Sequence, residues 1–480
     1  MGAEVAEHLR LKWGSGRPVP LDQLAQPRRR MSTNALMGMG LWLLLWLGYN
    51  TGPGYVMSPN FPASTMDFIH GVRAFFPMAA AWFAILLIFA RSSRLVAWIM
   101  GPLGLMLLYA VLGMISSTTL SPDRMYASYY GINYLAMVLV LLAIAAVEDP
   151  IPDLRNVLRL TWIVGTILTL SLLGAIPFLG SWAISEAQTS PVGVMAYPRV
   201  REVLGMAGSR NTGFARYAAI SALVALAGLL RKGNVFVRML WGIVFATSIY
   251  ALIIANGRTE ILGFICGAMV IFLADRAKRT VSILIGIPAA LLLGLWRFYS
   301  AFFLYFTRTG KFEYTLSGRT RAWAEGWQFI WESPWVGFGF QADRYFVKAH
   351  MHNAFLHVLV QAGFLGGSAI LIGLAIVWFF IFKHFFVNPP SDRSLIPSEI
   401  PAVFAFVTFS SVTESTFAYF SATWLLSAPI VAYVMALHRH LQRERAKAAW
   451  EKLLNWRLAT NHLHDDGSRE GIAGVPRSVA

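Results

Sequence analysis

The chain has little charge for its length, a single cysteine and no evident cleavable leader. Only 13% of its 480 residues are charged and 56% are hydrophobic, which excludes an ordinary soluble protein. The lone Cys266 cannot form an intrachain disulfide, so it gives no information on the redox compartment. The first apolar run, near Ala35, follows three arginines, but no small-residue cleavage site comes after it. We therefore expect that run to remain as the first membrane helix.

No internal repeat of convincing period is present, so an inverted-repeat transporter gains no support. The chain instead contains a series of apolar runs whose lengths are typical of transmembrane helices. The sequence predicts an all-α integral membrane protein with about 12 transmembrane helices. The expected spans are 35–49, 74–90, 95–115, 133–147, 157–180, 212–230, 236–255, 260–275, 280–303, 354–382, 401–419 and 423–438. The tenth contains Gly363, Gly366 and Gly367, and is expected to be a short helix, a break and then a full span.

Lysine and arginine gather in alternate loops, which predicts the orientation of the chain. The basic set is the N-terminal tail, Arg91 with Arg94, Arg155 with Arg159, residues 231–238, 276–279 and 383–393, and the tail from Arg439. By the positive-inside rule these segments face the cytoplasm, and this topology accounts for the formal net charge of +16 without nucleic acid. The expected organisation is a cytoplasmic tail over 1–34, nine spans over 35–303, a large periplasmic loop over 304–353, three spans over 354–438 and a cytoplasmic tail over 439–480.

The opposite side, periplasmic or extracellular, should carry few basic residues, yet arginines cluster there. Arg210 closes one such loop, Arg258 follows an apolar helix in IIANGRTE, and more basic residues lie within 308–348. A positive cluster on the translocated side predicts an anionic ligand. Arg258 by itself also fits an arginine that snorkels to the interface. The functional alternative is a bidentate donor to phosphate oxygens, a task that suits the planar guanidinium.

Residues 317–367 form a polar, tryptophan-rich island between hydrophobic runs. Arg319 and Arg321 open an amphipathic segment there. Three tryptophans recur on one face of that segment at every fourth position: Trp323, Trp327 and Trp331. Such a helix is expected to rest on lipid headgroups through its tryptophans, and it would hold Arg319 at the depth of a lipid-linked phosphate.

The island continues, after Pro334 and a glycine-containing turn, to a His-Met-His-Asn sequence directly before an apolar helix. His350 and His352 share one face only if this stretch is extended. A metal site would require a third ligand, for which no obvious spacing exists. Asn353 fits a helix N-cap, and histidine suits general-base work on a hydroxyl group.

Taken in order, NGRTE, SGRTRAW, SPWVGFGF and HMHN before a glycine-containing helix resemble the O-antigen ligase and polysaccharide polymerase superfamily of polytopic bacterial glycosyltransferases. The resemblance covers about residues 253–367, whereas the earlier helices match only in hydrophobicity. It implies transfer of a glycan from undecaprenyl diphosphate to an acceptor at the periplasmic face of the bacterial inner membrane. It implies no nucleotide sugar, no cofactor and no metal.

The resemblance also implies roles for individual residues. Arg258 and Arg319 would clamp the diphosphate, and His352 would activate the acceptor hydroxyl. Further substrate-binding candidates are Arg321, His350, Asn353, Arg210 and Glu414. Glu414, near the outer end of the eleventh span, could orient the histidine or bind sugar, and a structural helix-end carboxylate is the alternative.

The acceptor stays open at the level of the sequence. A ligase would use lipid A core, a polymerase a second lipid-linked glycan, and a protein-glycosylating relative a Ser or Thr hydroxyl; we favour the ligase. A transporter without covalent chemistry would carry charges deep within its helices, whereas the charges here lie at the outer boundary. We predict that Arg258, Arg319 and His352 converge beneath residues 304–351, around a cavity open to lipid.

Overall fold

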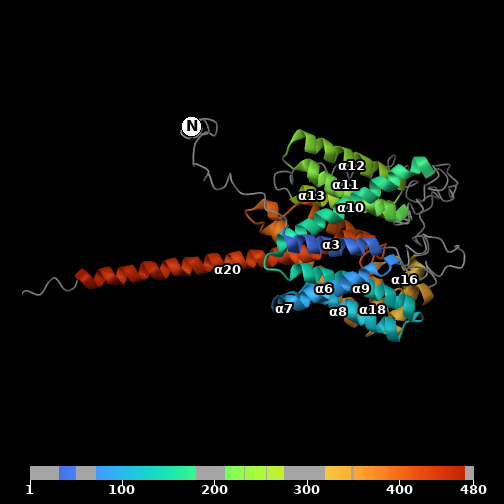
Figure 1. The fold of residues 1–480 in the computed structure, drawn as a ribbon, viewed down its shortest axis with the longest axis horizontal. Helices are drawn as coiled ribbons and strands as arrows, with labels where there is room; N and C mark the ends of the chain where they lie inside the picture. The colour runs from blue at the N-terminus through green and yellow to red at the C-terminus, as the bar shows by residue number, and fades with distance from the viewer. Residues whose placement is uncertain are drawn as a thin grey trace, which may run out of the picture.

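The computed structural model describes residues 32–49, 72–179, 211–231, 233–255, 257–274, 319–346 and 351–470. Every regular element in these ranges is helical (Figure 1). In chain order they are α3 (Thr33–Gly48), α6 (Phe76–Ala90), α7 (Ser92–Ile99), α8 (Pro102–Thr119), α9 (Arg124–Ala145), α10 (Pro150–Leu179), α11 (Asn211–Leu230), α12 (Val235–Ala255), α13 (Arg258–Ala274), α16 (Arg319–Glu332), α17 (Asp343–Phe346), α18 (Ala354–Ile381), the π-helical turn η3 (Phe382–Val387), the 3-10 turn η4 (Arg393–Leu395), α19 (Glu399–Ser410) and α20 (Ala422–Glu470).

Six of the described helices are long and apolar enough to cross a membrane: Pro102–Thr119, Arg124–Ala145, Pro150–Gly174, Gly213–Leu230, Val235–Ala255 and Ala354–Val387. α3 and α6 are also apolar but shorter, with 16 and 15 residues. The prediction of an α-helical membrane protein is therefore confirmed for this part of the chain. The total of twelve spans stays a prediction, and its ninth span, 280–303, lies outside the described residues.

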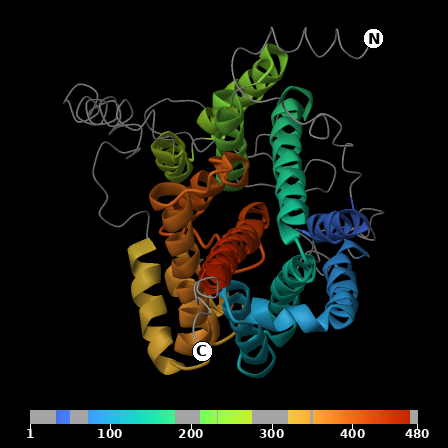
Figure 2. The same cartoon turned by 90° about the vertical axis from the view of Figure 1, so that its left-hand side faces the viewer.

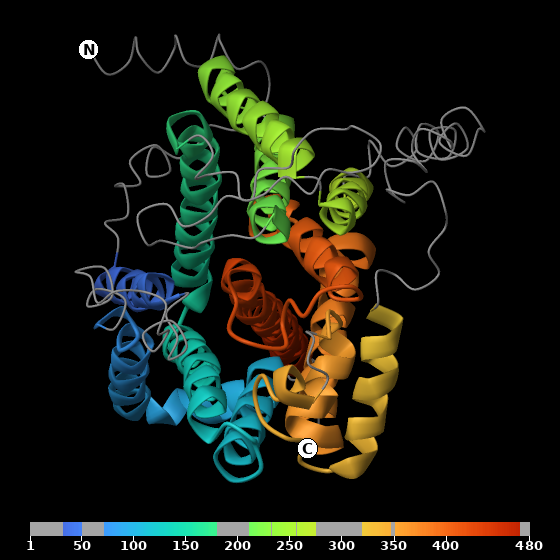
Figure 3. The same cartoon turned by 90° about the vertical axis from the view of Figure 1, so that its right-hand side faces the viewer.

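α20 occupies the centre of the bundle in its first half and leaves the bundle in its second. Residues 424–437 are all buried, and the two end-on views show other helices arranged around them (Figure 2, Figure 3). Farther along, Trp450 and Trp456 are 63% and 65% exposed. The helix continues to Glu470, far beyond the predicted end of the last span at 438, and projects from one end of the bundle (Figure 1). Residues 439–456 contain many good helix formers and neither glycine nor proline, so nothing in the sequence stops the helix.

α18 is broken near Gly363, as the glycines in this span predicted. Gly363 has φ +60° and ψ −167°, a conformation essentially restricted to glycine. In an unbroken helix the N–H groups of Phe364 and Leu365 would donate to the carbonyls of Val360 and Gln361. The break separates these two pairs, so four backbone groups need other partners.

The turn formed by residues 334–339 supplies a partner for each of these four groups. Its Phe338 and Gly339 N–H groups donate to the two separated carbonyls, both at 2.8 Å. Its Pro334 and Trp335 carbonyls accept from the two separated N–H groups at 2.6 and 3.2 Å. Because lipid offers no hydrogen bonds, a break in a membrane helix persists only where protein provides them. The SPWVGFGF turn therefore satisfies the backbone groups that the break leaves unpaired. The helix before this turn, α16, packs against α18.

The predicted eleventh span, 401–419, is too long at its C-terminal end. α19 stops at Ser410, and residues 411–421 form a mostly buried, non-helical link to α20. Hydroxyl groups hold this link in place: Ser411 Oγ donates to the carbonyl of Val407 at 2.6 Å, and Ser421 Oγ donates to that of Thr416 at 2.8 Å. Glu414 therefore lies in a buried link and not at the end of a helix.

Two further boundaries differ from the prediction. The apolar run 95–115 is divided at Gly101 and Pro102 into α7 and α8, with the proline at the first position of α8, where a missing N–H costs no hydrogen bond. α9 begins at Arg124 instead of residue 133, because the Asp123 carboxylate accepts a hydrogen bond from the Tyr126 N–H at 3.0 Å and caps the helix.

Candidate active site

Glu414 is the central carboxylate of a cluster of charged side chains. Its Oε1 accepts a hydrogen bond from Arg319 Nη2 at 3.0 Å, and its Oε2 accepts one from Arg216 Nη2 at 2.7 Å. His352 Nδ1 lies 3.2 Å from the same Oε2. α16, which carries Arg319, lies at the end of the bundle opposite the projecting part of α20 (Figure 1). One carboxylate thus joins α11, α16, the residue before the cap of α18 and the 411–421 link.

The members of this cluster are buried to different depths. The side chain of Glu414 is 5% exposed and that of Arg216 is 12% exposed, whereas Arg319 and His352 are 24% and 30% exposed. Burial by itself would raise the pKa of Glu414, but the charge of Arg216 and the hydrogen bond with His352 lower that pKa to about 2. Glu414 is therefore ionised at neutral pH, and Arg319 and His352 are the members most accessible from outside.

A second carboxylate, Glu260, extends the cluster. Arg216 Nε donates to Glu260 Oε1 at 3.2 Å while its Nη2 donates to Glu414, so one guanidinium bridges two carboxylates. Sequence reasoning missed both Arg216 and Glu260. The available signal was the arginine within an otherwise apolar 18-residue run, Gly213–Leu230, because a charge in such a run requires a partner.

Arg258 is the first residue of α13, two positions before Glu260. The preceding Gly257 packs against α11 so closely that an added Cβ would lie 2.5 Å from Ala215 Cβ. The following Thr259 accepts a hydrogen bond from Thr413 Oγ1 at 3.1 Å. The start of α13 is thus held between α11 and the 411–421 link, which places Arg258 at the same end of the bundle as the cluster.

The backbone around His352 is fixed on both sides. His352 has φ +48°, a conformation that is uncommon outside glycine and requires support from its surroundings. Before it, the Met351 N–H donates to Asp343 Oδ2 at 3.2 Å, and the Met351 carbonyl accepts from Trp323 Nε1 at 2.8 Å. After it, the Asn353 side chain caps α18 and donates to the carbonyl of residue 412 at 3.1 Å. The predicted N-cap role of Asn353 is confirmed.

The ionised Glu414 determines which nitrogen of His352 carries the proton. A carboxylate can only accept hydrogen bonds, so the 3.2 Å contact requires the proton to be on Nδ1. In that tautomer Nε2 holds the lone pair and can take a proton from a hydroxyl group. The pair thus has the geometry of a histidine base that is oriented by a carboxylate.

The predicted amphipathic helix is α16, and Pro334 lies just beyond its end. Its buried face consists of Ala322, Gly326 and Ile330. Trp327 and Trp331 are 47% and 60% exposed, and their rings meet edge to face with centroids 6.0 Å apart. Trp323 is partly buried through its contact with the backbone before His352.

Of the remaining predicted substrate-binding residues, the structure describes only Arg321, which does not join the cluster. Arg321 pairs with Glu325 on its own helix at 2.7 Å, and its side chain is 87% exposed. His350 and Arg210 lie outside the described residues, as do residues 304–318, so the predicted cavity beneath that region is not described either.

Residues 243–371 match the family model described as O-antigen ligase. The matched segment contains Arg258, Arg319 and His352 in that order. This match supports the resemblance to the O-antigen ligase superfamily that the sequence motifs indicate. No curated protein matches it.

The O-antigen ligase segment contributes only part of the charged cluster. Arg319, His352 and Glu260 lie within residues 243–371, whereas Arg216 precedes this segment and Glu414 follows it. The carboxylate that contacts the histidine thus comes from the link between α19 and α20. The link lies beside the matched segment because Glu414 contacts both Arg319 and His352.

Proposed function

We propose that this protein is an O-antigen ligase-type glycosyltransferase. It would move a glycan from undecaprenyl diphosphate to an acceptor hydroxyl at the periplasmic face of the bacterial inner membrane. The observation that carries the proposal is the meeting of Arg319 and His352 on Glu414, at 3.0 and 3.2 Å. Transfer from a lipid diphosphate requires a fixed cation for the leaving group and a base for the incoming hydroxyl, and this arrangement provides both.

The arginines serve the donor in this proposal. Arg319 uses one Nη2 contact with Glu414, and its other N–H groups can donate to phosphate oxygens. Arg258, at the start of α13, would hold the diphosphate from the other side. Because both positions belong to ordered helix starts, their charges are in place before the bond breaks, which is the condition for electrostatic stabilisation of a leaving group.

The histidine serves the acceptor. His352 Nε2 takes the proton of the acceptor hydroxyl as the hydroxyl oxygen attacks the anomeric carbon. The bond between that carbon and the diphosphate oxygen breaks, and its electron pair leaves with the undecaprenyl diphosphate. The proton stays on the imidazole, where the ionised Glu414 stabilises the new positive charge.

The acceptor distinguishes the possible activities. We favour lipid A core, as in a ligase; a polymerase of O-antigen or exopolysaccharide repeat units would use a second lipid-linked glycan at the same donor site. A transporter would need the donor site without the base, so the paired His352 and Glu414 support covalent transfer.

The test uses the purified full chain with a lipid-diphosphate glycan and, separately, lipid A core or a second lipid-linked glycan. We expect glycosylated lipid A core. Product with the lipid-linked acceptor alone would replace the ligase by a polymerase. An intact donor with both acceptors would contradict glycosyl transfer to either of them.

Matched arginine variants connect the activity to the site. Arg319→Gln should lower kcat by at least about 100-fold, because it removes one fixed donor to the developing charge. Arg124→Gln, an exposed arginine at the start of α9, should keep the wild-type rate. Equal rates for the two variants would remove Arg319 from the mechanism.

A further inference from the structure

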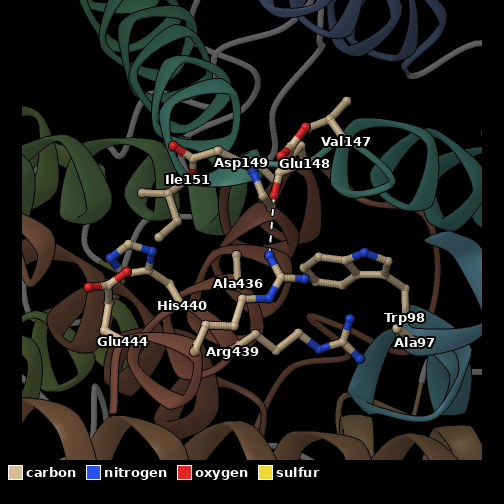
Figure 4. A pocket seen from close by; sticks show the side chains of 12 residues that line it. Ala97, Trp98, Val147, Glu148, Asp149, Ile151, Ala436, Arg439, His440 and Glu444 are labelled. Carbon is tan, nitrogen blue, oxygen red and sulfur yellow. Dashed lines mark hydrogen bonds between the residues drawn. The ribbon is translucent and has the colours of Figure 1, made fainter. Parts of the chain in front are cut away.

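A cavity of about 570 Å³ lies where α20 leaves the bundle, at the end remote from α16 (Figure 1). Figure 4 shows the side chains that line it. Its walls come from α7, the link before α10, the first turn of α10, and residues 436–444 of α20. The volume is within the range of pockets that bind small molecules or headgroups. Neither Glu414 nor any residue that contacts it lines this cavity, so it is separate from the proposed active site.

Two arginines of α20 lie on the wall of this cavity beside a tryptophan. The Arg439 guanidinium lies over the ring of Trp98, 4.3 Å from its centroid, and Trp98 is only 5% exposed. Stacking uses the face of a guanidinium and leaves the N–H groups at its edge available for hydrogen bonds in its plane. Arg443, one turn along, also lines the cavity and donates through Nη1 to the carbonyl of Glu148 at 3.4 Å. This pair suits a phosphate group.

Carboxylates lie on the other walls of the same cavity. Glu148 and Asp149 come from the link before α10, and Figure 4 shows them on the wall across from Arg439. Glu444 lines the cavity beside His440. A purely anionic ligand would meet these three carboxylates, and a purely cationic one would meet the two arginines. The distribution favours a ligand that carries one charge of each sign.

The surface next to the cavity is apolar. α7, which provides Trp98, is followed by Met100, and the side chains of Val96, Ile99 and Met100 are 64%, 42% and 82% exposed. Such a group of exposed apolar side chains beside a charged pocket is what an amphipathic ligand requires: a place for its headgroup and a place for its chains.

We propose that this cavity binds the phosphoethanolamine headgroup of a phospholipid. Arg439 and Arg443 hold the phosphate, Glu148 and Asp149 hold the primary ammonium, and the acyl chains lie along the exposed apolar side chains of α7. A choline headgroup carries the same charge but has no N–H donor for the carboxylates. A glycerol headgroup has no positive charge to balance them.

The binding experiment compares lipids that differ only in headgroup. The purified, delipidated full chain is titrated with phosphatidylethanolamine, phosphatidylcholine or phosphatidylglycerol of identical acyl chains, and bound lipid is counted by native mass spectrometry. We expect at least tenfold tighter binding of the ethanolamine lipid. Equal binding of all three, no retained lipid, or a preference for another headgroup would overturn the proposal. Soluble glycerophosphoethanolamine that binds as tightly as the lipid would assign the cavity to a free phosphate ester.

Charge variants give a result that loss of structure would not produce. Glu148→Gln with Asp149→Asn removes two negative charges from one wall, so the preference should change from the ethanolamine lipid to phosphatidylglycerol. Arg439→Gln with Arg443→Gln should weaken ethanolamine-lipid binding at least tenfold. Arg445→Gln, an exposed arginine of α20 that does not line the cavity, should bind as wild type. An unchanged preference in the first double variant, or unchanged affinity in the second, would refute the assignment.

Discussion

Replacing Glu414 by glutamine should affect both stability and turnover, because this carboxylate has three partners. The substitution keeps the size of the side chain and removes its charge. Arg216 and Arg319 then lose the anion that they share. His352 then faces an amide, which can donate as well as accept, so the contact no longer requires the proton to be on Nδ1. The side chain of Glu414 is only 5% exposed, so water cannot replace these contacts at low cost.

Two arguments give the size of the stability effect. The pKa of Glu414 falls from 4.5 to about 2 in the folded chain. At about 1.4 kcal/mol per pKa unit, ionised Glu414 stabilises the fold by about 3 kcal/mol at neutral pH. Independently, removing one partner of a buried ion pair costs about 3–5 kcal/mol. We therefore expect Glu414→Gln to lower the free energy of unfolding by about 3 kcal/mol.

The effect on turnover follows from the tautomer. Loss of the carboxylate that orients a histidine base lowers kcat by about 10⁴-fold in serine proteases, so we expect a fall of at least about 100-fold here. The assay is glycan transfer by variant and wild type under conditions where both are folded. Glu325→Gln is the matched control: Glu325 pairs with an exposed arginine on α16 and should change stability by less than about 0.5 kcal/mol and kcat not at all. A Glu414→Gln protein with wild-type kcat would refute the orienting role.

Three further predictions follow from the same contacts. Because the pKa of Glu414 is lowered by folding, the stability that its charge provides is complete above about pH 4.5 and is lost as the pH falls through about 2. The difference in unfolding free energy between wild type and Glu414→Gln should shrink over that interval, and a constant difference would contradict it. His352→Gln should lower kcat at least about 100-fold with little change in the donor KM, and a retained rate would exclude it as the base. Gly363→Ala should destabilise the chain by about 2 kcal/mol or more, because its Cβ would lie 2.2 Å from the Trp335 carbonyl carbon, whereas Gly40→Ala, with open space around it, should be neutral or stabilising in thermal unfolding.

Much of the fold could be predicted because it depends on local patterns. Apolar runs located the helices from α3 to α13, and three glycines located the break in α18. The end of α19 was placed too late, because apolar residues return at 417–419 after the polar stretch SSVTEST of residues 410–416, and the run was taken as continuous. Within that stretch, Ser411 Oγ donates to the carbonyl of Val407 at the end of the helix. The length of α20 was missed for a different reason: charge marks the limit of a membrane span and not the limit of a helix.

The residues of the candidate site that lie within residues 317–367 could be predicted from the sequence, whereas Arg216, which lies far from that segment, could not. Arg319 and His352 were identified from motifs within residues 317–367, and their meeting on Glu414 agrees with the option that this carboxylate orients the histidine. Arg216 was missed because its hydrophobic run was assessed by length alone. Its partner Glu414 lies 198 positions away, and no local pattern connects two residues at that separation.

The charges of the cluster give a reason for its two carboxylates. Arg216 and Arg319 contribute two positive charges, and Glu260 and Glu414 contribute two negative ones, so these four side chains carry no net charge. Arginines without such partners would bind the proposed diphosphate donor strongly before the reaction. Interactions that are equally strong in the ground state and in the transition state do not raise kcat.

Through its two contacts, Glu414 can couple the interaction of Arg319 with the proposed diphosphate to the protonation of His352. Its Oε1 engages Arg319 in the resting site, while its Oε2 faces His352. In the proposed mechanism, a proton that arrives on the histidine would draw Glu414 toward the imidazolium. Arg319 would then be released toward the diphosphate, which gains negative charge in the same step. Base and clamp then act as one unit, so the losses of Glu414→Gln and Arg319→Gln should not add. A double variant with kcat near that of the slower single variant supports this coupling, and a kcat lowered by the product of the two single effects would show that the residues act independently.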